Sequence, residues 1–164
     1  MLDILSENTT KDMALYMLIG GVIRIIIWIF FALTLYRTLK LIKKENLCIL
    51  PSQAWFVAVP LFNIYWNFEV AKRLADSLNN EFYDRKVEVE EKPTQKWGLI
   101  FAWTFLLSNI PLPLFVLTTI SILHLVYFIT YWVKIHEYKT LLRMHVEHYG
   151  KDFIAEHKDE PSDK

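Results

Sequence analysis

Three side chains able to hold an anion or pass a proton interrupt long apolar runs of this sequence: Arg24, Asn63 and His124. A guanidinium in hydrocarbon costs about 2.5 to 3.5 kcal/mol, so it normally faces polar partners. If the runs form antiparallel helices, the three residues fall at about one depth. Asn67 shares a helical face with Asn63, and Pro60 precedes both by one turn. The pattern predicts a polar layer at mid-depth, with the proline kinking its helix.

This polar layer has two possible uses. Asparagine and histidine between membrane helices commonly fix helix register, at about 0.6 to 2 kcal/mol each. In that case Asn63 and Asn67 meet Arg24 and His124 only to hold the bundle together. Alternatively, the same residues line a path for a small anion or a proton in an oligomer. The sequence leaves both uses open.

Other chemistry finds little support in the sequence. His136, His145 and His148 lack the H-E-x-x-H spacing of zinc proteases. The single cysteine, Cys48, excludes a multi-cysteine metal site. We therefore expect no catalytic residue, no metal and no cofactor. A membrane enzyme acting on lipid, with Glu69 beside His136, is a third alternative.

Composition places these residues in a membrane protein. Hydrophobic residues make up 54% of the 164 residues, and mean hydropathy is +0.24, more than a soluble domain of this size usually carries. The apolar residues form blocks separated by charged segments, as expected for helices dissolved in lipid. Acidic and basic residues number 18 each, so no excess of positive charge favours nucleic acid.

The blocks predict an all-α fold: an integral membrane four-helix bundle with cytoplasmic amphipathic helical extensions. A polar segment, residues 1–13, precedes the first block without the basic leader of a signal peptide. The predicted spans are 14–36, 53–71, 97–112 and 114–133. The predicted extensions are 72–84 and 134–149, and residues 150–164 are expected to form a polar disordered tail.

Each extension carries an apolar stripe at helical spacing. These stripes could meet each other, the surface of the lipid bilayer or a protein partner, and self-association is an alternative use of the same faces. Their residues are Leu74, Leu78, Phe82, Leu142, Val146 and Tyr149. We therefore expect a non-catalytic accessory or scaffold subunit, with the oligomeric transporter or channel-like protein as the alternative.

Orientation follows from the basic residues. Four crossings put both termini on one side with ten Lys and Arg residues near helix ends, against four in the loop after residue 36. The bias of basic residues makes the ten-residue side cytoplasmic. A rival arrangement breaks 53–71 at Pro60 into a re-entrant hairpin. That arrangement puts the N-terminus outside and nearly every basic residue inside.

Several stretches of the chain share a family pattern. Trp55 with "VPLFN" at 59–63, "VAKRLADSL" at 70–78 and "WGLIFAWTFLLSNI" at 97–110 resemble a family of uncharacterised bacterial four-span membrane proteins, known as a domain of unknown function. The resemblance covers residues 14–133 and departs at the histidine-bearing C-terminal helix. It implies a four-span fold in a bacterial inner membrane and carries no activity.

Overall fold

The chain is all-helical in the part that a computed structural model describes, residues 2 to 153, with side chains described from residue 11 onward. The elements are α1 (Leu2–Leu41), η1 (Lys44–Asn46), η2 (Pro51–Ala58), α2 (Phe62–Asp84), α3 (Gln95–Ser108) and α4 (Leu114–Tyr149), where η marks 3₁₀ turns. The all-α prediction is confirmed for these residues. Of the predicted tail, residues 154–164 lie outside the described part.

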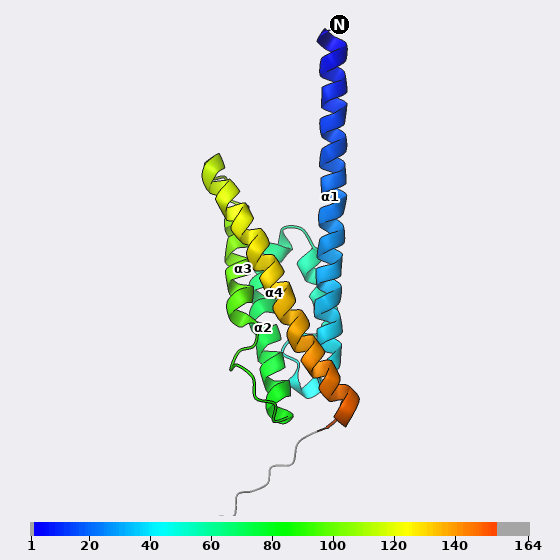
Figure 1. The fold of residues 1–164 in the computed structure, drawn as a ribbon, viewed down its shortest axis with the longest axis vertical. Coiled ribbons are helices and arrows are strands. Elements are labelled where there is room, and N and C mark those ends of the chain that lie inside the picture. Colours follow the sequence, from blue (N-terminus) through cyan, green and yellow to red (C-terminus); the bar gives the residue numbers. More distant parts are fainter. Residues whose placement is uncertain (1, 154–164) are drawn as a thin grey trace, which may run out of the picture.

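Two helices, α1 and α4, are long and apolar enough to cross a membrane among residues 11 to 153. They diverge as two limbs toward one end of the molecule (Figure 1). Their apolar side chains face outward there, with Tyr16 73% exposed and Leu114 80% exposed. A core helix of a soluble protein hides such residues, so these two helices have the surfaces of lipid-facing segments.

The predicted second span is wrong as a single helix. Residues 51–58 form the 3₁₀ segment η2, and α2 begins at Phe62. Between them Leu61 takes a positive φ of 65°, which a kinked but continuous helix does not contain. Pro60 therefore ends one element instead of bending it, because it cannot donate a backbone hydrogen bond. The Trp66 indole donates to the Gln53 carbonyl at 3.0 Å and fastens α2 to η2.

The chain after α1 forms a hairpin. It leaves the end of α1, turns at Pro60 and comes back along α2 to the same end of the molecule. The backbone N–H of Lys43 donates to Glu81 Oε2 at 3.0 Å, and Asn46 Nδ2 donates to Asp84 Oδ2 at 2.9 Å. The end of α1 and the end of α2 thus lie together, as the rival hairpin arrangement requires. The start of α1 lies at the opposite end of the molecule from the end of α4 (Figure 1). Among residues 2 to 153, the beginning and the end of the chain therefore lie at opposite ends of the molecule.

The third predicted span is also shorter than expected. α3 covers 14 residues, Gln95–Ser108, which at 1.5 Å per residue is about 21 Å. A hydrocarbon core is about 30 Å thick. Residues 109–113, with two prolines, are not helical and do not extend it. α3 therefore reaches only part of the depth that α4 covers.

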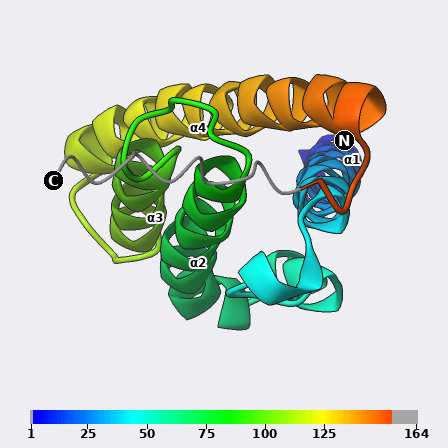
Figure 2. The ribbon, with the colours of Figure 1, turned by 90° about the horizontal axis from the view of Figure 1, so that it is seen from below.

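An aromatic core joins α1, α3 and α4 beside the point where the limbs separate. Phe31 lies 6.0 Å from Phe101 and 5.2 Å from Phe128, measured between ring centroids. Trp132 of α4 donates to Thr34 Oγ1 of α1 at 3.0 Å. Viewed from below, α4 lies across α3, α2 and α1 (Figure 2). This packing fixes the base of the two limbs.

The apolar stripes of the two extensions meet each other, so they are not free docking surfaces. Leu74, Leu78, Phe82 and Leu142 are each 0% exposed within one core, and Val146 packs against that core. Tyr149 is 51% exposed, and its ring centroid lies 4.8 Å from that of Phe153. Helix α2 does continue to Asp84, and α4 ends at Gly150, which takes a φ of 87°. Of the alternatives for these stripes, the structure shows burial in a shared core, which leaves Leu74, Leu78, Phe82 and Leu142 no exposed surface for a partner or lipid.

Candidate functional site

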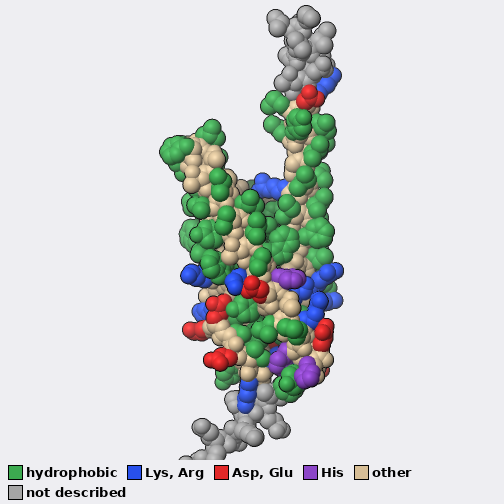
Figure 3. Space-filling model, in the orientation of Figure 1, with side chains coloured by type: hydrophobic (Ala, Val, Ile, Leu, Met, Phe, Trp, Pro, Cys, Tyr) green, Lys and Arg blue, Asp and Glu red, His purple; other side chains and the backbone are tan. Residues whose placement is uncertain are grey.

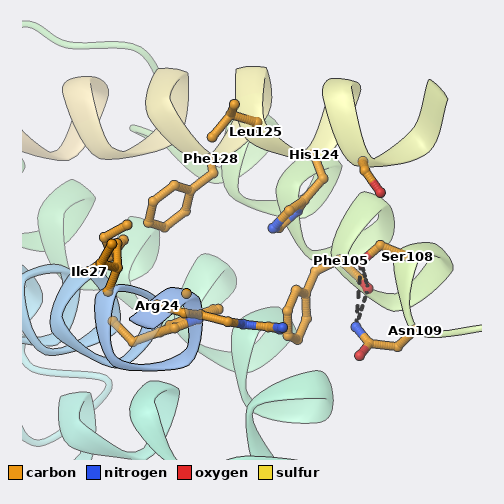
Figure 4. A pocket seen from close by; sticks show the side chains of 12 residues that line it. Arg24, Ile27, Phe105, Ser108, Asn109, His124, Leu125 and Phe128 are labelled. Atoms are coloured by element: carbon orange, nitrogen blue, oxygen red, sulfur yellow. Dashed lines mark hydrogen bonds between the residues drawn. The ribbon is translucent and has the colours of Figure 1, made fainter. Parts of the chain in front are cut away.

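Arg24 lies between two cavities at the floor of the space between the limbs. We call this space, bounded by α1 and α4 above Arg24, the notch. Figure 3 shows it as a hollow between two apolar limbs, with a basic side chain at its floor. In Figure 4 the Arg24 side chain extends from α1 toward Phe105 of α3. Arg24 is exposed, and its side chain points from α1 into the space between the helices.

The first cavity, of about 460 Å³, lies between α1, α3 and α4. Its polar lining consists of Arg24, Ser108, Asn109, Ser121 and His124. The His124 ring lies against Phe101 and Phe105, each with a centroid separation of 5.4 Å. Its Nδ1 has no hydrogen-bond partner among the described residues. Arg24 and His124, which the sequence predicts at one depth, thus both line this cavity.

The second cavity, of about 530 Å³, lies on the other side of Arg24. It is lined by the turn at Pro60 and Leu61 and by Asn63 at the start of α2. Asn63 is only 7% exposed. The η2 segment reaches the level of Arg24, and the chain turns back there at Pro60. This break therefore brings the Asn63 amide beside α1.

Asn67 lies apart from the other predicted members of the layer. It is 1% exposed and lines neither cavity. Neither its amide nitrogen nor its amide oxygen has a partner among the described residues. One turn further along α2, Ala71 lies close to Gly98 of α3, so Asn67 belongs to the packed side of the bundle. The structure places Arg24 between the cavity that His124 lines and the cavity that Asn63 lines, and it places Asn67 at neither.

Asn109 borders both cavities, and the sequence analysis missed it. Its Nδ2 donates to the Phe105 carbonyl at 2.7 Å and closes the end of α3 (Figure 4). Its position just before two prolines was the available signal, since an asparagine there often ends a helix.

Most other donors at the first cavity are already used within their own helices. Ser121 Oγ donates to the Leu117 carbonyl at 2.8 Å, and Ser108 Oγ donates to the Phe105 carbonyl at 2.8 Å. Arg24 makes no hydrogen bond or ion pair with any side chain described between residues 11 and 153. A guanidinium offers five N–H groups. The donor capacity of the site is therefore concentrated on Arg24.

A second polar cluster, which we call the basal network, lies at the opposite end of the bundle. Glu81 and Arg85 form an ion pair with Oε1 and Nε 2.7 Å apart, and both side chains are 0% exposed. The other carboxylate oxygen of Glu81 accepts from the Lys43 backbone and from Asn46 Nδ2 at 3.0 and 2.9 Å. The i,i+4 spacing of this pair was visible in the sequence, but its burial was not.

The basal network also holds the end of the described chain. Arg85 donates from Nη2 to the Lys151 carbonyl at 2.8 Å and from Nη1 to the Gly150 carbonyl at 3.2 Å. Lys43 Nζ donates to the Phe153 carbonyl at 2.7 Å. His145 Nδ1 lies 3.4 Å from Arg85 Nη1. Burial, together with Arg85 and His148, lowers the pKa of His145.

Metal chemistry gains no support from the described part of the chain. Among residues 11 to 153 no group of three or more His, Cys, Asp and Glu side chains could hold a metal ion. Glu69 pairs with Arg73 at 2.8 Å, and no interaction joins it to His136 among the contacts of the described residues.

Comparison with known proteins returns no match to a family model, to a curated protein or to a solved structure. The resemblance to a bacterial four-span family therefore stays a prediction.

Proposed function

We propose that this chain is a small, non-catalytic integral membrane protein that crosses the bilayer three times and serves as an accessory subunit of another membrane protein. The crossings are α1, α3 together with the non-helical residues 109–113, and α4. The hairpin from η2 to the start of α2 enters from the basal end without crossing. Arg24 carries this proposal, because a guanidinium left without a partner between two lipid-facing helices fits a subunit whose site is completed from outside the chain.

The charge distribution supports this placement. Lys and Arg residues from Arg37 onward gather at the basal end, below a band of apolar surface (Figure 3). The bias of basic residues makes that end cytoplasmic. The N-terminus then lies outside, which is the orientation of the re-entrant arrangement. The resemblance to bacterial proteins favours the inner (plasma) membrane as the location.

Cys48 offers a test of this topology without any engineered residue, because it is a free and exposed thiol. In intact cells expressing the protein, a membrane-impermeant maleimide should leave Cys48 unlabelled until the membrane is permeabilised. A Lys11→Cys variant in a Cys48→Ser background should label at once. Labelling of Cys48 from outside would support four crossings and refute the three-crossing arrangement.

A transport role is the second candidate, favoured by the presence of a cavity on each side of Arg24. The aromatic core disfavours it, since Phe31, Phe101 and Phe128 pack together on the basal side of the notch. Anion efflux from vesicles that contain the protein decides between the two. We expect the same efflux rate with and without protein; an Arg24-dependent increase would support transport.

A further inference from the structure

We propose that the notch binds a transmembrane helix of a different protein, and that this helix carries an aspartate or glutamate at mid-depth that pairs with Arg24. The inference rests on the three-crossing placement proposed above and adds the chemistry of the partner. The juxtaposition behind it is an unpaired guanidinium at the floor of a hollow whose two walls are exposed apolar helices.

The walls of the notch are surfaces that a helix can pack against. On α1, Ile23 is 52% exposed, and on α4, Leu125 is 57% exposed; both line the first cavity. A Cβ added at Gly20 or at Gly21 would meet no atom within 4 Å. Small residues of this kind allow another helix to approach closely in a membrane. The α1 wall is therefore open just where it leads down to Arg24.

The charge of the site selects an acidic occupant from another protein. No Asp or Glu occurs between Met13 and Tyr36 or between Trp97 and Val133. The nearby acid of α2, Glu69, is paired with Arg73. A second copy of this chain would bring a second Arg24 and no carboxylate to the notch, so self-association does not neutralise the site.

The depth of Arg24 distinguishes a helix from a lipid headgroup. Arg24 lies 11 residues after Met13 and 12 before Tyr36, which is about 17 and about 18 Å along the helix. A phosphate held at the membrane surface would have to descend through about half of the hydrocarbon core of about 30 Å to reach it. A transmembrane helix can carry a carboxylate at any depth and satisfies its own backbone in lipid.

The test uses a synthetic helix as the partner. A Leu-rich peptide of about 21 residues, long enough to span the bilayer, carries a central Glu and a terminal acceptor dye. The protein carries a donor dye on Cys48 and is reconstituted with the peptide in phosphatidylcholine vesicles. Energy transfer measures binding. We expect the central-Glu peptide to bind at least about tenfold more tightly than a central-Leu peptide.

Variants of the protein identify the contact. Arg24→Leu should abolish the preference for the central-Glu peptide, and Arg24→Lys should restore part of it because the positive charge returns. Arg37→Leu is the matched control, since it removes an exposed cation from the same helix, and it should leave binding unchanged. The preference for the central-Glu peptide is measured on the protein without substitutions, so poor folding of a variant cannot produce that preference.

Four outcomes overturn the proposal: equal binding of both peptides, binding of neither, a Glu preference that survives Arg24→Leu, or loss of the preference when oleate or phosphatidylglycerol is added. The last outcome assigns the site to an anionic lipid instead. Impermeant labelling of Cys48, in parallel vesicles that contain the protein without dye, reports topology separately. A failure of the three-crossing placement is thereby distinguished from a failure of the helix partner.

Discussion

Two arginines in this protein have opposite surroundings. Arg85, in the basal network, is fully buried, forms an ion pair with Glu81 and donates to two backbone carbonyls. Arg24, at the floor of the notch, contacts no carboxylate in the described part of the chain. A buried charge is tolerated when its partners are supplied by the same fold. The difference indicates that the basal end is complete within one chain, whereas the notch is not.

The largest effect is expected when one partner of the buried Glu81–Arg85 pair is removed. Arg85→Leu leaves Glu81 buried with an uncompensated charge, so we expect the free energy of unfolding to fall by about 3 to 5 kcal/mol. Glu69→Ala is the control, because its partner Arg73 is half exposed and such a pair contributes about 0 to 1 kcal/mol. Denaturant unfolding of the detergent-solubilised protein measures both. Equal losses would show that the basal pair is not buried.

Arg24→Leu should act in the opposite direction. Replacing an unpaired arginine at mid-depth by leucine removes a cost of about 3 kcal/mol on insertion scales. We expect α1 to insert into microsomes more efficiently and the isolated protein to lose no stability. Arg37→Leu, at the surface, should change insertion less. A destabilisation on the scale of Arg85→Leu would mean that Arg24 has a partner within the fold.

Glycine substitutions test the packed region against the open limb. A Cβ at Gly98 would lie 2.7 Å from Ala71 Cβ and 2.8 Å from the Tyr131 ring, so Gly98→Ala should cost about 1 to 3 kcal/mol. Gly21→Ala meets open space and should be neutral or slightly stabilising, since alanine is the better helix former. Thermal unfolding of the two variants in one detergent compares them. Equal effects would contradict the difference in packing.

The smallest expected effect is a dependence of the basal network on pH. The pKa of His145 is lowered by burial and by its neighbours Arg85 and His148, so the folded protein binds fewer protons there than the unfolded chain. This contribution to stability is complete above about pH 6.5 and declines as pH falls below it. Hydrogen exchange in residues 145–153 should be faster at about pH 5 than at about pH 7.5. A His145→Asn variant should lose that difference.

The sequence predicted the long helices well because no proline lies within their apolar runs, residues 14–36 and 114–133, and the end of α4 at Gly150 followed from the glycine itself. It failed at Pro60. A proline inside an apolar run is compatible with a kink or a break, and the choice depends on whether η2 packs on α1, a contact distant in sequence. The same tertiary contact decides whether the chain crosses or returns.

The sequence predicted the depth of the candidate-site residues, but not which of them line the cavities. Helical spacing placed Arg24 level with Asn63 and His124, because depth follows from the rise per residue. The isolation of Asn67 and the contribution of Asn109 depend on how the helices rotate against one another, which spacing does not specify. The burial of Leu74 and Leu142 within one core likewise needed the hairpin between α1 and α2.

The most direct test of this account is one distance across the basal end. Spin labels at Lys44→Cys and Asp152→Cys, both exposed positions, are introduced in a Cys48→Ser background and measured by double electron–electron resonance in vesicles. Because the end of α1 and the end of α4 share one side of the membrane, the account predicts a separation shorter than the hydrocarbon thickness of about 30 Å. A separation larger than that thickness would place residue 44 on the far side of the bilayer and contradict the account.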